Sequence, residues 1–206
     1  SELEALLTIG RALEMVAPNA DSPPNIKLTE GTFAPSTTGE SFPIIMISNV
    51  NLIGQGEEVT ILDAEQTARV MYIDNCINNT ISMLSIINGF SGAAVSNLDG
   101  GGMHISSSNP ILSHITFRYN LAAFGGALFL NGASPLITNV TIRNNEATGN
   151  GGGILMDYFS NPILKNVNIA DNIAGEWGGG MNIFFSEPKF LDVSIINNKS
   201  GSGGGG

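Results

Sequence analysis

The chain has 206 residues, is 42% hydrophobic and carries a formal net charge of −10. This length allows one sizeable domain, and the hydrophobic content with only 13% charged residues excludes an intrinsically disordered chain. The acidic balance argues against nucleic acid and anionic membranes as partners, and no apolar run reaches the roughly 18 residues that a membrane-spanning helix needs.

The N-terminal residues predict a short helix and then a strand. Apolar residues recur at helical spacing between residues 6 and 16, in Leu6, Ile9, Ala12, Leu13 and Val16. Residues 25–33 predict a strand followed by a turn. An amphipathic helix of this kind would cover the open end of a larger fold.

A repeat dominates the rest of the chain. Each of its aligned segments follows a glycine cluster and closes on an asparagine, and these asparagines lie 25, 27 and 26 residues apart. Weaker copies of the unit occur over residues 48–56 and 81–89. The aligned segments are NPILSHITFRYN (109–120), SPLITNVTIRNN (134–145), NPILKNVNIADN (161–172) and EPKFLDVSIINN (187–198).

The alternation of apolar and polar residues inside each unit predicts β-strands. Strands that recur with the same phase stack most simply in parallel, so each turn of chain would form one rung of a coil. We therefore predict an all-β fold, a parallel β-helix or solenoid. Its interior columns would be Ile115, Val140, Val167 and Val193; Phe117, Ile142, Ile169 and Ile195; and Leu112, Ile137, Leu164 and Phe190. A structural ladder of amides would run through Asn120, Asn145, Asn172 and Asn198.

Parts of the chain resemble two known families. Gly125-Gly126-Ala127-Leu128 and Phe117-Arg118-Tyr119-Asn120 resemble the GGA(I/L/V) and FxxN repeats of chlamydial polymorphic outer-membrane proteins. The first 65 residues resemble the capping region of the pectin-lyase-like superfamily. The resemblance implies a right-handed coil with a short capping α-helix. We assign residues 1–46 to this N-terminal cap and 47–206 to the rungs, which we expect to continue beyond residue 206 in a longer protein.

The superfamily includes polysaccharide lyases and hydrolases, so the resemblance directs attention to acids and bases on an outer face. The sequence assigns no catalytic residue; the candidates are Arg118, Arg143, Asp157 and Asp171. We predict no metal site and no cofactor, because one carboxylate beside the two arginines is too few for a tight Ca²⁺ site. The two histidines, His104 and His114, are expected on the surface.

Aromatic residues in the loops could form a platform for sugar rings. The candidates for ligand binding are Tyr158, Trp177 and Phe124, since the last two precede glycine clusters at equivalent positions. Further loop aromatics are Tyr119, Phe159, Phe184 and Phe185. The loop acids Asp99, Asp157, Glu146 and Glu176 follow no metal-binding spacing and are expected to be scattered on the surface.

Three functions stay open on this evidence. The first is a non-catalytic scaffold of a secreted or cell-surface bacterial protein, an adhesin or assembly segment whose partner would be a glycan or a host or surface protein. The second is a polysaccharide-active lyase or hydrolase that uses an outer face. The third is a filament subunit whose β-helices associate end to end.

Overall fold

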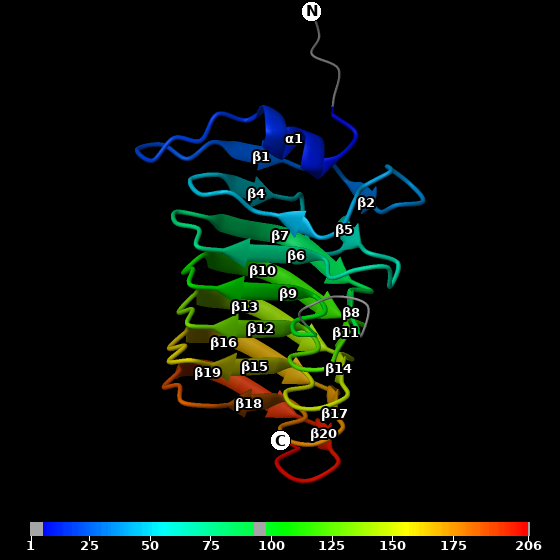
Figure 1. Cartoon of the computed structure of the whole chain (residues 1–206), viewed down its shortest axis with the longest axis vertical. Helices are drawn as coiled ribbons and strands as arrows, with labels where there is room; N and C mark the ends of the chain where they lie inside the picture. Colours follow the sequence, from blue (N-terminus) through cyan, green and yellow to red (C-terminus); the bar gives the residue numbers. More distant parts are fainter. Residues whose placement is uncertain (1–5, 93–97, 206) are drawn as a thin grey trace, which may run out of the picture.

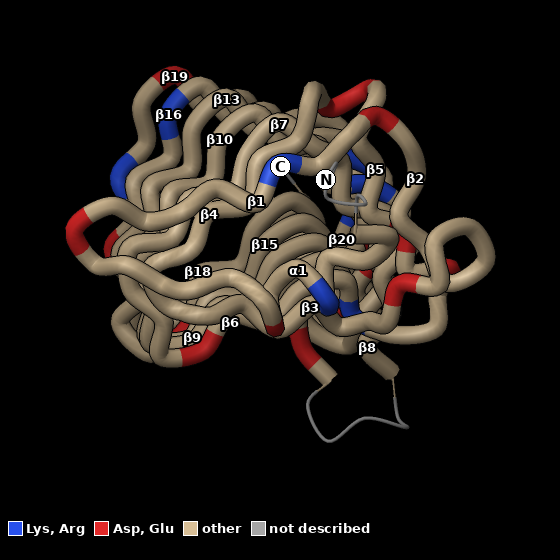
Figure 2. Tube along the Cα trace, turned by 90° about the horizontal axis from the view of Figure 1, so that it is seen from above, with Lys and Arg blue, Asp and Glu red and all other residues tan. Residues whose placement is uncertain are grey.

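The chain winds into a coil whose turns lie on top of one another (Figure 1). The computed structural model describes residues 6–92 and 98–205. Residues 1–5 of the predicted cap and Gly206 of the predicted rungs lie outside this described part. All strand pairs are parallel, and viewed along the axis the successive turns superimpose (Figure 2). The predicted parallel β-helix is confirmed.

Three sheets form the walls of the coil. The first sheet contains β1 (Asn25–Lys27), β4 (Asn51–Ile53), β7 (Thr80–Ile87), β10 (Ile111–Arg118), β13 (Leu136–Arg143), β16 (Ile163–Ala170) and β19 (Lys189–Ile196), with β2 (Gly31–Phe33) and β5 (Thr60–Asp63) beside them. The second sheet contains β3 (Ile44–Ile45), β6 (Met71–Asp74), β9 (Met103–Ser106), β12 (Leu128–Asn131), β15 (Ile154–Asp157) and β18 (Met181–Ile183). The third sheet contains β8 (Phe90–Ser91), β11 (Leu121–Ala122), β14 (Glu146–Ala147), β17 (Ile173–Ala174) and β20 (Lys199–Ser200).

The predicted interior columns are present in register. Ile115 pairs with Val140, Val140 with Val167, and Val167 with Val193. The column through Phe117 and the column through Leu112 follow the same register. Phe190 differs from the expected burial, being 45% exposed, because its strand β19 is the last of the first sheet and no further strand packs beneath it.

The long strands of the first sheet bend at one residue, which the alternation did not predict. His114, Asn139, Asn166 and Asp192 each have a positive φ, between 52° and 55°. The bend explains why two outward residues, rather than one, separate the buried Leu112 from the buried Ile115. Each strand thus covers two sides of the interior.

The asparagine ladder is confirmed between the first and third sheets. The Oδ1 atom of Asn145 accepts the backbone N–H (3.1 Å) and the Nδ2 amide (2.9 Å) of Asn120. The Nδ2 atom of Asn145 donates to Oδ1 of Asn172 (2.9 Å) and to the carbonyl oxygen of Phe117 (3.1 Å). Asn198 continues the ladder from Asn172 (2.9 Å). The buried amides are therefore satisfied by adjacent rungs.

Glycine is required in the segment between the third and second sheets because adjacent turns come very close there. Gly125 has a φ of 63°, in the left-handed region that glycine tolerates. A Cβ atom on the next residue, Gly126, would lie 2.4 Å from the carbonyl oxygens of Glu146 and Gly152. The recurrent glycine clusters thus let successive backbones approach.

A helix lies at the N-terminal end of the coil, beside β1 (Figure 1). α1 (Ile9–Met15) begins at Thr8, whose Oγ1 accepts the N–H of Arg11 (3.2 Å), and it buries Ile9 and Leu13. Strands β1, β2 and β3 fall inside the range 1–46 and pair with strands of the next turn. Within the described residues no helix is both long and apolar enough to cross a membrane.

Candidate functional site

The outer face of the second sheet carries a column of large side chains. Tyr72, His104, Phe129 and Leu155 are paired in register on β6, β9, β12 and β15. Their neighbours on each strand belong to the interior core, so these four point outward. His104, Phe129 and Leu155 are nevertheless buried. Although they point outward, these three side chains are therefore largely shielded from solvent.

Two adjoining hollows open on this face. The first, of about 330 Å³, has Phe129 and Leu155 on its floor, and its other described residues come from loops and strand ends: Asp99, Phe124, Asn150, Asp157 and Phe184. The second, of about 430 Å³, is lined by Asp157, Tyr158, Phe159, Phe184 and Phe185. Because the two hollows share Asp157 and Phe184, we describe them together as the aromatic groove.

The aromatic groove ends at the turn that follows the second sheet, and this turn changes from rung to rung. Asn75, Ser107 and Gly132 occupy its left-handed position in the upper rungs, where small or polar residues tolerate a positive φ. After β15 the turn is one residue longer and contains Tyr158 and Phe159, both with positive φ; after β18 the left-handed residue is Phe185.

These aromatic side chains are held in the open. Tyr158 is 68% exposed, Phe159 73%, Phe184 53% and Phe185 71%. The rings of Phe184 and Phe185 meet edge to face, with centroids 5.6 Å apart. Bulky residues in a left-handed conformation cost free energy, and their exposure recovers little of it by burial. Phe184 and Phe185 follow β18, the last strand of the second sheet, so their exposure has the same cause as that of Phe190. Tyr158 and Phe159 are followed by a further rung and are still exposed, so these two residues favour a binding role over a packing role.

Two carboxylates face the aromatic groove, Asp99 and Asp157. Burial raises the pKa of Asp99, and the charge of Asp157 raises it further, whereas Arg69 opposes the change. The guanidinium of Arg69 is directed at the backbone: its Nε donates to the carbonyl oxygens of Asp99 (3.0 Å) and Gly100 (2.9 Å), and Nη2 donates to Ser91 Oγ (3.1 Å). Burial lowers the pKa of Arg69 itself.

His104 lies one rung above Phe129 and is only 3% exposed, so the expectation of a surface position is wrong. Its ring packs edge-on between Tyr72 (centroids 5.1 Å apart) and Phe129 (4.9 Å). Within the described part of the chain its Nδ1 atom is buried without a hydrogen-bond partner. Burial lowers the pKa of His104 to about 4, Arg69 lowers it further and Asp74 opposes both.

The structure places the four catalytic candidates at two different corners. Arg118 pairs with Arg143 at the end of the first sheet, and Asp171 lies at the next turn of that corner. The guanidinium of Arg118 lies over the ring of Tyr119, 5.5 Å from its centroid. Asp157 ends β15 of the second sheet, in the aromatic groove. No ion pair joins the arginines to a carboxylate within the described residues.

The three ligand-binding candidates lie on or near the aromatic groove. Phe124 lines one hollow and Tyr158 lines the other. Trp177 follows Phe124 and Asn150 along one column: Gly125 N–H donates to the Asn150 carbonyl (2.9 Å) and Gly151 N–H to the Trp177 carbonyl (2.9 Å). Trp177 is exposed but is not among the residues that line either hollow.

Sequence reasoning did not bring Asp99, His104 and Phe129 to one surface. Asp99 was expected among scattered acids, and the weaker upstream repeats gave no register for β6. Pairing the alternating residues of 71–74, 103–106 and 128–131 would have revealed the outward column, since Tyr72, His104 and Phe129 hold the same position in each.

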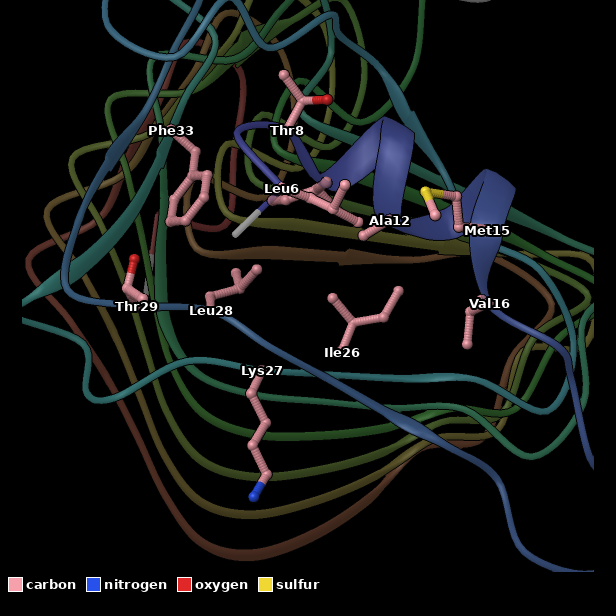
Figure 3. A pocket seen from close by; sticks show the side chains of 11 residues that line it. Leu6, Thr8, Ala12, Met15, Val16, Ile26, Lys27, Leu28, Thr29 and Phe33 are labelled. Carbon is pink, nitrogen blue, oxygen red and sulfur yellow. The ribbon is translucent and has the colours of Figure 1, made fainter. Parts of the chain in front are cut away.

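A third hollow, of about 410 Å³, lies under α1 at the cap (Figure 3). Its lining is mainly apolar, as in Ile26, Leu28 and Phe33, and the amine of Lys27 points away from it. Among the described residues that line it, only Lys27 is titratable, and its amine lies outside the hollow. Among the residues that the structure describes, no three His, Cys, Asp or Glu side chains are grouped to hold a metal ion.

Comparison with known proteins bears on the fold. The family described as "Right handed beta helix region" matches residues 44–205. A solved structure of a pectin methylesterase from Yersinia enterocolitica superposes with a TM-score of 0.56 at 14% identity, covering 94% of this chain and 65% of that one. At this identity the likeness shows the fold alone. This chain thus spans about 65% of the length of that enzyme. No curated protein matches the sequence.

Proposed function

Because the chain belongs to the right-handed beta helix family, we propose that it is a non-catalytic binding segment of a secreted or cell-surface bacterial protein, and that its aromatic groove holds a polysaccharide. The family assignment supplies the right-handed scaffold and leaves the ligand open, since one fold serves many functions. The resemblance of the repeats to adhesion-associated outer-membrane proteins stays a prediction, and it agrees with a surface role.

The observation that carries the proposal is the set of exposed aromatic rings at the end of the groove. Tyr158, Phe159, Phe184 and Phe185 hold their faces open to solvent, and two hollows join at Phe184. Sugar rings bind proteins by stacking on aromatic faces while carboxylates and amides take their hydroxyls, and Asp157 and Asn150 supply such groups here.

The length of the groove also suits a chain rather than a single sugar. Its lining spans the rungs of β12, β15 and β18. Adjacent rungs are about 4.8 Å apart, so these rungs present a surface of roughly 10 Å along the axis, which is about the length of a disaccharide. The structural neighbour is, by its name, an enzyme of pectin, which is also a polysaccharide.

The test is a titration of the protein with a panel of soluble glycans by calorimetry, with Tyr158→Ala and Phe184→Ala as groove variants. Each variant should weaken binding about fivefold to thirtyfold, the equivalent of losing one aromatic contact of ~1–2 kcal/mol. Tyr119→Ala is the matched control, because Tyr119 is an exposed aromatic at another corner. Absence of binding across the panel, or equal losses in all three variants, would overturn the proposal.

One observation favours a second function, polysaccharide cleavage. Asp99 and Asp157 lie on one groove, and the pKa of Asp99 is raised by burial and by Asp157, as suits a carboxyl group that donates a proton. The test is a depolymerisation assay that follows unsaturated products by ultraviolet absorbance and new reducing ends chemically, with and without Ca²⁺. If the protein cleaves a glycan and Asp99→Asn abolishes the cleavage, the protein is an enzyme. If the glycan binds but stays intact, the non-catalytic binding function is supported.

A further inference from the structure

We infer that the aromatic groove selects glycans that carry free amino groups and rejects acidic glycans. This inference rests on the proposed function and names the class of ligand that the same groove would take. It follows from where the charged side chains of the described residues lie, and it differs from what the pectin-related neighbour would suggest, since pectin is an acidic polymer.

The groove presents two carboxylates, and the charge of Arg69 offsets part of the charge of Asp99. Asp157 lines both hollows, and its Oδ1 atom accepts only the N–H of the adjacent Tyr158 (2.7 Å). The carboxylate of Asp99 accepts no hydrogen bond from the residues that the structure describes, although its backbone carbonyl binds Arg69. Asp99 and Asp157 are close enough that the charge of one raises the pKa of the other.

Apart from Arg69, the cations of the described chain lie away from the two carboxylates. No lysine or arginine is among the described residues that line either hollow. Arg118 and Arg143 end strands of the first sheet, where Lys27, Lys165 and Lys189 also lie. Arg11 is on α1 and Lys199 is on the third sheet. Arg69 is the cation whose charge acts on Asp99, and its Nε and Nη2 atoms donate to the backbone carbonyls of Asp99 and Gly100 and to Ser91 Oγ.

A ligand would therefore meet a negative field on an apolar floor. A uronate polymer would bring its carboxylates beside Asp99 and Asp157, and like charges at such a site weaken binding. An amino sugar offers the same ring faces for stacking on Tyr158 and Phe184, and its ammonium group would pair with either carboxylate. The amine is thus the sugar substituent that both parts of the groove accept.

The experiment compares three probes of equal length on the intact chain: glucosamine oligomers, the same oligomers after N-acetylation, and oligogalacturonate. The wild-type protein should bind the glucosamine oligomers about threefold to tenfold more tightly than the acetylated ones, and this preference should shrink as salt is raised. Asp99→Asn and Asp157→Asn should each reduce the preference, whereas Asp171→Asn, an exposed carboxylate at another corner, should leave it unchanged.

The outcomes separate this inference from the proposed function. Equal binding of the acetylated and free-amine oligomers, or tighter binding of oligogalacturonate, would overturn the inference. In that case, weaker glycan binding by Tyr158→Ala would still support the proposed glycan-binding function. Failure of all three probes to bind would overturn both. A preference for the amine that Asp171→Asn reduces as much as Asp157→Asn would also overturn the inference, because it would reflect only the net charge of the chain.

Discussion

Two corners of the coil treat their polar groups in opposite ways. At the corner between the first and third sheets, Asn120, Asn145 and Asn172 repeat the same residue and the same hydrogen bonds in successive rungs. At the corner after the second sheet, the left-handed position is Asn75 in one rung, Gly132 in another and Phe185 in the last. The first corner is uniform and repeats one residue whose side chain forms hydrogen bonds between rungs, whereas the second corner varies, since its residue differs from rung to rung.

The contrast shows how a repeat protein separates stability from function. A residue that stacks on its own copy contributes the same stabilising contact in every rung, so repetition serves the fold. A residue that departs from the repeat and lies exposed in an unfavourable backbone conformation adds nothing to that stack. On this argument the departures from the repeat, Tyr158, Phe159 and Phe185, mark the binding surface.

The largest expected effect is at the uniform corner. Asn145→Ala removes the acceptor of two Asn120 donors and leaves buried backbone groups such as the Phe117 carbonyl without that partner. Leaving several buried groups unsatisfied should lower the free energy of unfolding by about 3 to 5 kcal/mol. Denaturant unfolding measures this free energy. The control is Asn168→Ala, at an exposed asparagine of β16, which should change the free energy of unfolding little. Equal losses in the two variants would show that the ladder stabilises the fold no more than an exposed asparagine does.

The next largest effect concerns His104 on the second sheet, whose buried Nδ1 atom has no hydrogen-bond partner among the described residues. His104 has a pKa lowered from 6.5 to about 4, chiefly by burial. The unfolded chain therefore takes up a proton at a higher pH than the folded chain. The stability that His104 confers is present above pH 6.5 and is lost as the pH falls towards 4, by about 3 kcal/mol at most.

His104→Phe should remove this loss, because a phenyl ring can pack between Tyr72 and Phe129 and does not titrate. The measurement is the free energy of unfolding of both proteins from pH 7 to pH 4. Asp99, whose raised pKa contributes with the opposite sign, is present in both and cancels in the difference. Parallel pH profiles for the two proteins would contradict the assignment.

The stacked parts of the molecule could be predicted from sequence for a physical reason. In a parallel coil each side chain meets its counterpart one repeat away, so aligning the repeats gives the register of Ile115, Val140 and Asn145 directly. The burial of residues in the last rung could not be predicted in this way, because a side chain there has a neighbour on one side only. Phe190 is therefore more exposed than its counterparts in the upper rungs.

Phe124, Asp157 and Tyr158 were candidates from the sequence and do line the groove. Their assembly with Asp99 and Phe129 escaped prediction because the groove residues come from different parts of each rung. Asp99 and Phe124 precede glycine clusters, Phe129 lies within a strand, and Asp157 and Phe184 follow or end strands of the second sheet. No spacing along the chain relates these classes of position. The buried state of His104 was missed for the same reason, since Tyr72 and Phe129 cover it from adjacent rungs.

The smallest expected effect lies at the varying corner and has the opposite sign. Phe185→Asn places at this turn the residue that Asn75 already provides in an upper rung, and asparagine tolerates the left-handed conformation better than phenylalanine. Since Phe185 is largely exposed, little burial is lost. The variant should gain on the order of 0.5 to 1 kcal/mol in unfolding free energy.

Glycan binding should fall in the same Phe185→Asn variant, so a single change would raise stability and lower function. Phe184→Asn is the control for strain, because Phe184 precedes the left-handed residue and does not itself have a positive φ. It should weaken binding without the gain in stability. Equal unfolding free energies for the two variants would show that the backbone at Phe185 is not strained. Only the exposure of these side chains would then support a binding role for this corner.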